Sequence, residues 1–391
     1  MTNYSAERMT YLNPYYFAGL NQRLAEMKAE GRPLIRLDIG SPDQPPAEHI
    51  IQALIESASQ PGHHGYQSHR GTEELRLAWM QLYRRLYDIE LDSQRELVPL
   101  LGSKEGIFHL SMALINPGDV VLVPDPGYIT YTRSALFAGA QIYKLPLLAA
   151  NDYLPDLEAI PPQILKRAKL LWMNYPNNPT AALAAPQFFA QAVEFAHQHK
   201  LIVCHDAAYA QITFNGKPAP SILSIPGALD VAMEFNSLSK TYNMAGWRVA
   251  AVLGNREALE TLFSLKTNLD SGCFRPVMDA AVAALTGEQD WLIGRNQIYR
   301  QRRDLITASL QAMSLNAIVP QATIYVWSPI PEGWSSMDFT NQLLEHTGVS
   351  LTPGVIFGRY GEGYIRIALT ASQKRAQEAM HLMRDWMESW A

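Results

Sequence analysis

The chain has 391 residues, of which 48% are hydrophobic and 18% are charged. This length exceeds one typical core and predicts a globular protein of two lobes. The formal net charge of -5 gives no basic footprint for nucleic acid or an anionic membrane, and two cysteines cannot build a disulfide framework or a cysteine-rich zinc site. No window is apolar enough to span a bilayer, so we expect a cytoplasmic protein with no membrane partner and no metal.

Residues 1–30 form a predicted N-terminal arm that is rich in aromatic side chains, among them Tyr11, Tyr15 and Phe17. Such an arm packs either on a partner subunit or on its own chain, and the sequence leaves both options open. A short strand over 33–40 follows, broken by turn residues at 41–46, and 48–58 has the pattern of a helix.

From residue 97 onward, short apolar strands alternate with helical segments. This alternation predicts an α/β fold whose mostly parallel sheet is covered by helices on both faces. The predicted strands are 97–101, 120–123, 141–145, 169–173, 201–204, 231–235 and 249–253, and the predicted helices are 104–114, 128–137 and 187–197.

The C-terminal part has the pattern of a smaller α+β lobe. A long helix is predicted over 291–313, strands over 324–327 and 364–368, and a last helix over 373–390 with Ser372 as its N-cap. The basic cluster of Arg300, Arg302 and Arg303 is interpreted as a solvated helix face. We therefore predict a small domain from 31–50 and 291–391, and a large domain from 51–290.

Polar clusters follow several predicted strands at the point where each strand ends. In parallel sheets of this kind, ligands bind at the carboxyl ends of the strands. The shared placement predicts that four clusters form one site: Gly102-Ser103, the segment 174–180, His205-Asp206 and the segment 237–240.

Lys240 follows the mostly apolar run 231–235 and is flanked by hydroxyl residues. A lysine that is shielded from water can lose its proton and become a nucleophile for carbonyl compounds. Ser237, Ser239 and Arg248 supply donors for an anion beside it. These residues predict a lysine-bound aldehyde cofactor that carries a phosphate, and the alternative is a solvated lysine in a polar loop.

Asp206 is expected in a dry environment at a strand end, where its carboxylate needs a cationic partner. A protonated pyridine nitrogen is such a partner and would remain an effective electron sink. The alternative is an ordinary aspartate that caps a turn. Asn178 offers an amide to a phenolic oxygen, although an Asn-Pro pair is also a common turn.

Two further segments suggest anion binding. Gly102-Ser103-Lys104 marks a strand-to-helix junction, where free backbone N–H groups favour a phosphate, but it lacks the Walker pattern. Arg366 lies among apolar residues on a probable strand, and an inward-facing arginine suits a substrate carboxylate. The alternative for Arg366 is an edge-strand arginine that faces solvent.

Together these segments resemble the class I aminotransferases, pyridoxal-phosphate enzymes of the aspartate-aminotransferase fold. The motifs Ser-Leu-Ser-Lys with a downstream Gly-Trp-Arg, Tyr-Pro-Asn-Asn-Pro-Thr and His-Asp-Ala-Ala-Tyr occur in the family's order and spacing. The resemblance covers nearly the whole chain. It implies a homodimer that transfers an amino group from an amino acid to a 2-oxo acid by a ping-pong mechanism, with pyridoxal 5'-phosphate as cofactor.

The resemblance also implies a role for each matching residue. Lys240 would hold the cofactor aldehyde as a Schiff base and shuttle a proton, Asp206 would pair with the pyridine nitrogen, and Tyr128 would stack on the ring. Asn178 and Tyr209 would bond the phenolic oxygen. The phosphate would be held by Gly102, Ser103, Lys104, Ser237, Arg248 and, across the dimer interface, Tyr66, while Arg366, Gly40 and Asn178 would bind the substrate.

Within the class, four stretches resemble the LL-diaminopimelate aminotransferase group: 101–107, 121–128, 204–209 and 239–244. Two departures concern the backbone. Ala181 stands where the family usually has Gly after Asn-Pro-Thr, and Ala250-Ala251 stand where it usually has a strand Gly, which predicts altered backbone geometry or tighter packing. Aspartate, alanine and aromatic donors, and less favoured β-lyase or decarboxylase reactions, are alternatives.

Two rival classes fail on sequence. Ser237 to Lys240 also spell Ser-x-x-Lys, but the Ser-Asp-Asn and Lys-Thr-Gly partners of the serine acyl-enzymes do not occur in the chain. A non-catalytic regulator on the same fold would be expected to carry a DNA-binding segment, and the N-terminal arm is short and not basic.

Overall fold

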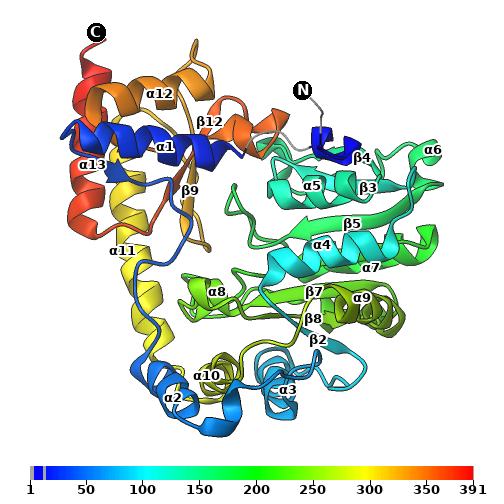
Figure 1. Ribbon diagram of the computed structural model, residues 1–391. Helices are drawn as coiled ribbons and strands as arrows, with labels where there is room; N and C mark the ends of the chain where they lie inside the picture. Colours follow the sequence, from blue (N-terminus) through cyan, green and yellow to red (C-terminus); the bar gives the residue numbers. More distant parts are fainter. Residues whose placement is uncertain (1–3, 12–14, 391) are drawn as a thin grey trace.

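The computed structural model describes residues 4–11 and 15–390 and shows two lobes (Figure 1). The large lobe is built on a seven-stranded sheet in the order β2-β8-β7-β6-β5-β3-β4. All neighbours are parallel except β8, which is antiparallel to both β2 and β7. The strands are β2 (Leu97–Leu100), β3 (Val120–Asp125), β4 (Gln141–Pro146), β5 (Ala168–Asn174), β6 (Ile202–Asp206), β7 (Ala232–Ser237) and β8 (Ala250–Gly254).

Helices cover both faces of this sheet because successive strand residues point to opposite sides. In β6, for example, Val203 belongs to the core on one face and Cys204 to the core on the other. The first face is covered by α2 (Glu48–Ala58), α3 (Glu73–Tyr87), α7 (Pro186–His199) and α10 (Arg275–Thr286), and the second by α4 (Ser103–Leu114), α5 (Ile129–Phe137) and α9 (Arg256–Leu269). Short helices α6 (Pro162–Leu165) and α8 (Leu238–Thr241) complete the lobe. The predicted α/β class is confirmed.

The small lobe contains a three-stranded antiparallel sheet in the order β11-β12-β9 and a two-stranded parallel pair, β1 and β10. Its elements are α1 (Tyr16–Ala29), β1 (Ile35–Arg36), β9 (Tyr325–Pro329), α12 (Ser336–Thr347), β10 (Val349–Ser350), β11 (Thr352–Pro353), β12 (Tyr364–Ala368) and α13 (Gln373–Glu388). Helix α11 (Trp291–Ala312) joins the lobes, because Leu292 packs in a large-lobe core and Ile306 in the small-lobe core. The predicted domain boundaries remain a prediction.

Local signals account for several element ends. Ser372 caps α13 and accepts a hydrogen bond from the Arg375 backbone N–H at 3.4 Å, as predicted. The N-terminal arm divides into an exposed 3-10 turn, Glu7–Tyr11, and helix α1, whose Leu20 and Leu24 pack with Leu344 of α12. At least this helix therefore packs on its own chain.

One prediction about α11 is wrong for two of its three arginines, whereas Arg300 is exposed as predicted. Arg302 and Arg303 are each only 6% exposed and do not form a solvated face. Arg302 forms two hydrogen bonds of 2.9 Å to the carboxylate of Asp43, and Arg303 donates to the Pro320 carbonyl at 2.9 Å. The sequence pattern could not reveal these contacts. Asp43 is distant along the chain from Arg302, and Pro320 lies in an irregular loop.

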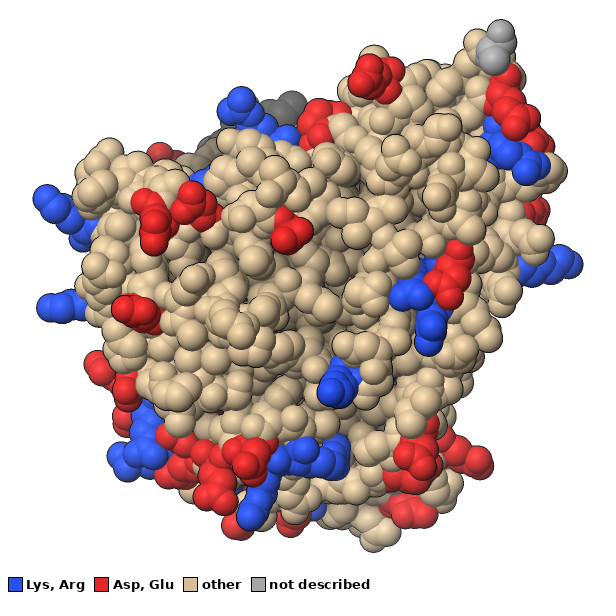
Figure 2. Space-filling view, turned by 180° about the vertical axis from the view of Figure 1, so that it is seen from behind, with Lys and Arg blue, Asp and Glu red and all other residues tan. Residues whose placement is uncertain are grey.

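The surface carries charges of both signs. On the face shown in Figure 2, Lys, Arg, Asp and Glu mix around the rim, and only scattered charged groups interrupt the tan middle of the face. Among the described residues, no helix has the length and apolar character needed to cross a membrane.

Candidate active site

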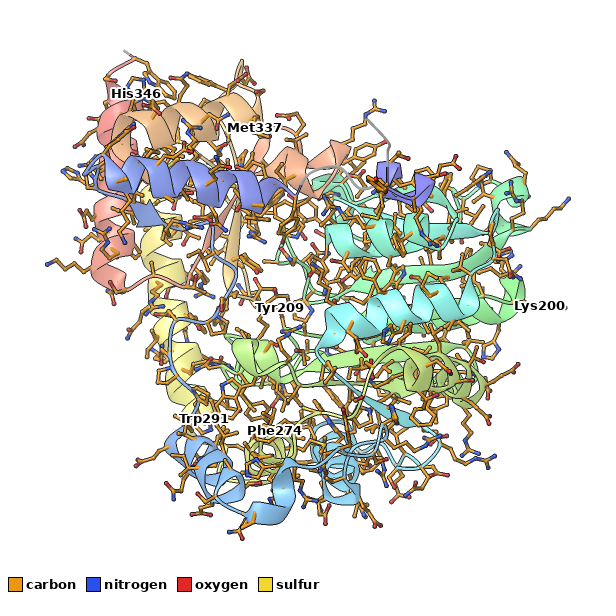
Figure 3. All side chains as sticks on the ribbon, viewed as in Figure 1. Lys200, Tyr209, Phe274, Trp291, Met337 and His346 are labelled. Carbon is orange, nitrogen blue, oxygen red and sulfur yellow. The ribbon has the colours of Figure 1, made fainter. Side chains whose placement is uncertain are left out.

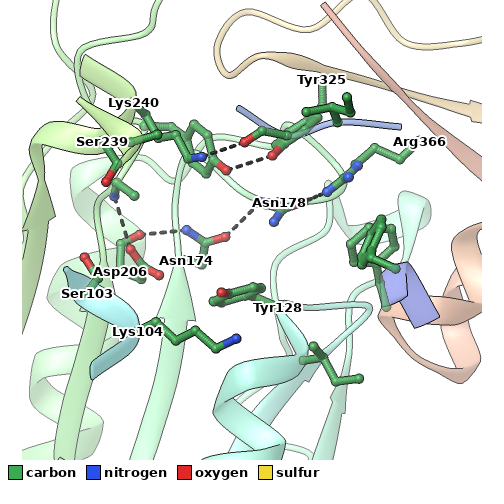
Figure 4. Close-up of a pocket in the computed structure, with 18 of the residues that line it drawn as sticks. Ser103, Lys104, Tyr128, Asn174, Asn178, Asp206, Ser239, Lys240, Tyr325 and Arg366 are labelled. Carbon is green, nitrogen blue, oxygen red and sulfur yellow. Dashed lines mark hydrogen bonds between the residues drawn. The ribbon is translucent and has the colours of Figure 1, made fainter. Parts of the chain in front are cut away.

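A cavity of about 500 Å³ lies at the carboxyl ends of the sheet strands, where the small lobe closes over them (Figure 4). It gathers most of the predicted site residues from segments that are far apart in sequence. The predicted residues that line it are Gly40, Ser103, Lys104, Tyr128, Asn178, Asp206, Tyr209, Ser237, Lys240, Arg248 and Arg366.

Lys240 lies in the short helix α8, directly after β7. Its Nζ donates a hydrogen bond to the Gly40 carbonyl at 2.5 Å, so the side chain reaches across the cavity to the small-lobe segment. Burial lowers the pKa of Lys240, and the positive charges of Arg366 and Arg248 lower it further. Tyr325 and Asp206 act in the opposite direction and raise this pKa. The environment therefore shifts the equilibrium toward the neutral amine, which is the nucleophilic form.

Arg295 of α11 holds the backbone around this lysine. Its Nη1 donates to the Lys240 carbonyl at 2.9 Å and also to the Thr241 carbonyl. These are carbonyls at the end of α8, which lack partners within the helix. Burial lowers the pKa of Arg295 to about 10. Sequence reasoning missed this residue because nothing local signals that an α11 side chain reaches α8.

Asp206 ends β6 and is 5% exposed. Its carboxylate accepts a hydrogen bond from the Tyr131 hydroxyl at 2.7 Å and one from the Ala208 backbone N–H at 3.2 Å. Burial raises the pKa of Asp206, while the Tyr131 hydrogen bond opposes the rise. Both donors are neutral, so a cation at the cavity side of this carboxylate would stabilise its ionised form.

Arg366 faces inward, with 4% of its surface exposed, which excludes the solvent-facing alternative. Its Nη1 donates to Asn178 Oδ1 at 2.8 Å, and its Nη2 donates to the Asp38 carbonyl at 3.1 Å. The guanidinium lies over the rings of Tyr325 and Phe357, 4.2 Å and 4.7 Å from their centroids. Its Nε is buried without a hydrogen-bond partner among the described residues, which leaves a donor for an anionic ligand.

Asn178 is held by its neighbour in the same loop. Its backbone N–H donates to Asn174 Oδ1 at 2.8 Å, and Asn174 Nδ2 in turn donates to the Asp206 carbonyl at 2.7 Å. Because Asn178 Oδ1 accepts from Arg366, its Nδ2 is the group left to donate to a ligand. The loop therefore ties the Asp206 strand to the Arg366 side of the cavity.

A cradle for an anion lies at the start of α4. The Ser103 Oγ is buried and has no hydrogen-bond partner in the described part of the chain. A Cβ on Gly102 would lie 2.0 Å from Arg248 Nη2, so the glycine leaves the space that the guanidinium fills. Burial and the charges of Arg133 and Arg248 lower the pKa of Lys104. Positive charge thus concentrates beside free α4 donors.

Three further predicted residues line the cavity: Ser237, Tyr128 and Tyr209. The Ser237 hydroxyl caps α8 and accepts from the Ser239 N–H at 3.2 Å. Tyr128 projects into the cavity near Lys104 (Figure 4), and burial raises its pKa to about 12. Tyr209 points into the space between the lobes (Figure 3), where its hydroxyl lies 3.0 Å from that of Tyr325.

Two predicted residues do not line the cavity: Gly102, which precedes Ser103 and packs against Arg248, and Tyr66. Tyr66 is 97% exposed in this single chain and does not line the site. Conversely, Tyr15, Tyr131 and Tyr325 line it and were not predicted as site residues. Tyr131 and Tyr325 lie on an ordinary helix and strand pattern, so only tertiary packing reveals them. For Tyr15, the aromatic cluster of the arm indicated that the side chain packs against something, but it did not indicate where.

The alanines that replace expected glycines have different surroundings. Ala181 has φ of 61°, in the left-handed region, which costs a residue with a side chain about 1–2 kcal/mol. Ala250 and Ala251 are fully buried in the extended strand β8, where they pair with Ser237 and Asn236. The expected change in backbone geometry therefore applies to Ala181, and the expected tighter packing applies to Ala250 and Ala251 in β8.

The fold and the site define a pyridoxal-phosphate enzyme of the aspartate-aminotransferase fold. A family model described as "Aminotransferase class I and II" matches residues 32–382, and the chain belongs to that family. It is 48% identical over 379 residues to the LL-diaminopimelate aminotransferase of Moorella thermoacetica, covering 97% of each chain. It is 47% identical to that of Desulforudis audaxviator, covering 98% of each.

Solved structures give the same result. A substrate-bound BacF structure from Bacillus subtilis superposes with a TM-score of 0.95 at 36% identity and 98% coverage of both chains. A Thermus thermophilus aspartate aminotransferase variant gives 0.91 at 26% identity, covering 98% of this chain and 100% of the other. The predicted family, enzyme class and pyridoxal phosphate cofactor are confirmed, with amino acids and 2-oxo acids as substrates.

Proposed function

We propose that this aminotransferase uses LL-diaminopimelate as amino donor and 2-oxoglutarate as acceptor. The observation that carries the proposal is the near-full-length similarity to curated LL-diaminopimelate aminotransferases, at 43% identity or more for eight relatives. Two of the stretches that resemble this group contribute to the cavity lining, with Ser103 and Lys104 from 101–107 and Ser239 and Lys240 from 239–244. We further propose a cytoplasmic role in lysine biosynthesis.

The cavity residues fit pyridoxal phosphate on three counts. The unpartnered Ser103 Oγ and the Arg248 guanidinium suit its phosphate. The Asp206 carboxylate, bonded only to neutral donors, suits its protonated ring nitrogen. Lys240, whose pKa is lowered by burial, suits its aldehyde. When bound, the cofactor supplies an electrophilic carbon and a ring that delocalises the electron pair left on the substrate α-carbon.

The residues of the chain then act in sequence. Arg366 binds the substrate α-carboxylate and fixes the donor in the cavity. The Lys240 amine would take the proton from the α-carbon of the donor and would return it on the cofactor side of the substrate nitrogen. Asp206 would pair with the protonated ring nitrogen, and Asn178 Nδ2 and the Tyr209 hydroxyl would donate to the phenolic oxygen. Tyr128 would stack on the ring, and Gly102, Lys104 and Ser237 would complete the phosphate cradle.

Amino transfer occurs in two halves. The donor amino acid leaves as a 2-oxo acid before the acceptor binds, and the acceptor takes the amino group through the same steps in reverse. Both acids carry an α-carboxylate, so the same Arg366 serves both halves. Gly40 belongs to this substrate side, because its carbonyl already lies 2.5 Å from Lys240 Nζ.

We propose that the working form is a homodimer. Tyr66 does not contact the cavity of its own chain, yet its hydroxyl is fully available on the surface. In the proposed dimer it reaches the phosphate in the partner subunit. The proposed dimer would also bring loops of both subunits to the substrate side chain.

An amino-donor comparison tests the proposed substrate. With 2-oxoglutarate as acceptor, glutamate formation is measured with LL-diaminopimelate, aspartate, alanine and phenylalanine, each over a range of concentrations. We expect the highest kcat/KM for LL-diaminopimelate, because the chain shares its site motifs with that group. Clear activity on another donor with none on LL-diaminopimelate would contradict the proposal. Ammonia release from a donor with a β-leaving group, without glutamate, would point to a β-lyase.

A further inference from the structure

Tyr325 contacts three parts of the site at once. It begins β9 of the small lobe, is 2% exposed and lines the cavity. Its hydroxyl lies 3.0 Å from the Tyr209 hydroxyl, and the two rings meet edge to face at 69°. Because Tyr209 follows β6 in the large lobe, this pair of hydroxyls bridges the two lobes inside the site.

The Tyr325 hydroxyl also lies against Gly40. A Cβ on Gly40 would fall 2.2 Å from the Tyr325 oxygen, so this close approach needs a glycine. The Gly40 carbonyl accepts the hydrogen bond from Lys240 Nζ. The Tyr325 hydroxyl therefore packs on the backbone that holds the lysine amine.

The face of the Tyr325 ring supports Arg366. The guanidinium lies 4.2 Å from the ring centroid, a distance at which a cation is attracted to an aromatic face. Strand β12, which carries Arg366, is paired with β9 in register. One side chain thus contacts the carboxylate-binding arginine through its ring and Tyr209 through its hydroxyl.

We propose that Tyr325 is a positioning residue that directs the Tyr209 hydroxyl proton toward the cofactor. A tyrosine hydroxyl donates one hydrogen bond and accepts others. If Tyr325 donates to the Tyr209 oxygen, the Tyr209 proton is left to point into the cavity. This inference rests on the proposed function, which puts the phenolic oxygen of the cofactor at that position. Losing the Tyr325 hydroxyl frees the Tyr209 proton to turn away.

The Tyr325→Phe variant tests this role. It removes one oxygen and keeps the ring under Arg366, so we expect an unchanged KM for the amino donor. The kcat should fall about twofold to tenfold, the effect of one hydrogen bond. The pH midpoint of the absorption change of the bound cofactor should rise by about half to one unit, because the phenolate loses an oriented donor. Asp206 and Arg366 also face Tyr209 and are unchanged in the variant.

A double-mutant cycle separates positioning from a structural role. In a Tyr209→Phe background, Tyr325→Phe should shift the midpoint no further, because its effect acts through the Tyr209 hydroxyl. Tyr364→Phe is the matched control, because it removes a hydroxyl from a tyrosine of the same sheet. The Tyr364 ring stacks on Trp327, and its variant should leave the midpoint unchanged.

Two results would overturn the inference: an unmoved midpoint in folded Tyr325→Phe protein, or an equal shift in the Tyr209→Phe background. The melting temperature of each variant without cofactor verifies folding. The midpoint is read without substrate, so a wrong amino donor in the proposed function leaves this test intact.

Discussion

Replacing Lys240 by alanine should abolish turnover. The Lys240 amine is the proposed nucleophile and proton carrier, and it extends across the cavity to the Gly40 carbonyl at 2.5 Å. Loss of proton transfer alone should lower kcat on the order of 10²–10⁴-fold, and loss of the nucleophile adds to that. Purified variant protein should also lose the visible absorption of the bound cofactor on dialysis, which a spectrum before and after dialysis measures.

The control for this prediction is Lys217→Ala, which removes an exposed lysine from a loop. It should retain both the absorption and the activity of the unaltered enzyme. Retention of turnover, or of cofactor absorption through dialysis, in the Lys240→Ala protein would show that the anchor lies elsewhere.

Replacing Glu234 by alanine should lower the free energy of unfolding by about 3–5 kcal/mol, because several buried donors lose their acceptor at about 1–3 kcal/mol each. Glu234 lies on β7 and is fully buried. It accepts hydrogen bonds from the Tyr83 hydroxyl at 2.7 Å, Ser221 Oγ at 2.9 Å and the Ile222 N–H at 3.0 Å, and it contacts His205 Nδ1 at 2.9 Å. Alanine would leave these groups buried without an acceptor.

Urea denaturation of the variant and the unaltered protein, both without cofactor, measures this change. The surface variant Glu194→Ala on α7 serves as control and should change stability by less than about 0.5 kcal/mol. A loss below about 1 kcal/mol for Glu234→Ala would contradict the structural interpretation of the network. His205 precedes Asp206 on β6, so this network also anchors the strand that carries the site carboxylate.

The centre of the site could be predicted from the sequence because its residues follow buried strands. Lys240 and Asn178 follow β7 and β5, Asp206 ends β6, and the carboxyl ends of neighbouring parallel strands meet at one edge. Once these strands were recognised, topology alone placed the side chains together. Arg366 was predicted on a weaker argument, the isolation of a charge in an apolar strand.

Residues that reach the site across the packing of other elements could not be predicted. Arg295 lies on α11 but serves carbonyls of α8, and Tyr131 lies on α5 but serves Asp206. Tyr325 reaches Tyr209 from the other lobe. Sequence periodicity indicates which face of an element is buried, but it does not indicate which distant polar group packs against that face. The same gap explains why the buried Arg302 was interpreted as a solvated residue.

A single-turnover experiment tests the central claim most directly. The purified holoenzyme is mixed with LL-diaminopimelate without any 2-oxo acid, and the visible absorption of the bound cofactor is followed with time. A ping-pong aminotransferase with this donor should lose that absorption in proportion to the enzyme present. Adding 2-oxoglutarate should then restore it and release one glutamate per site. Unchanged absorption with LL-diaminopimelate, in protein that responds to another amino acid, would contradict the proposed donor, and no response to any amino acid would contradict amino transfer itself.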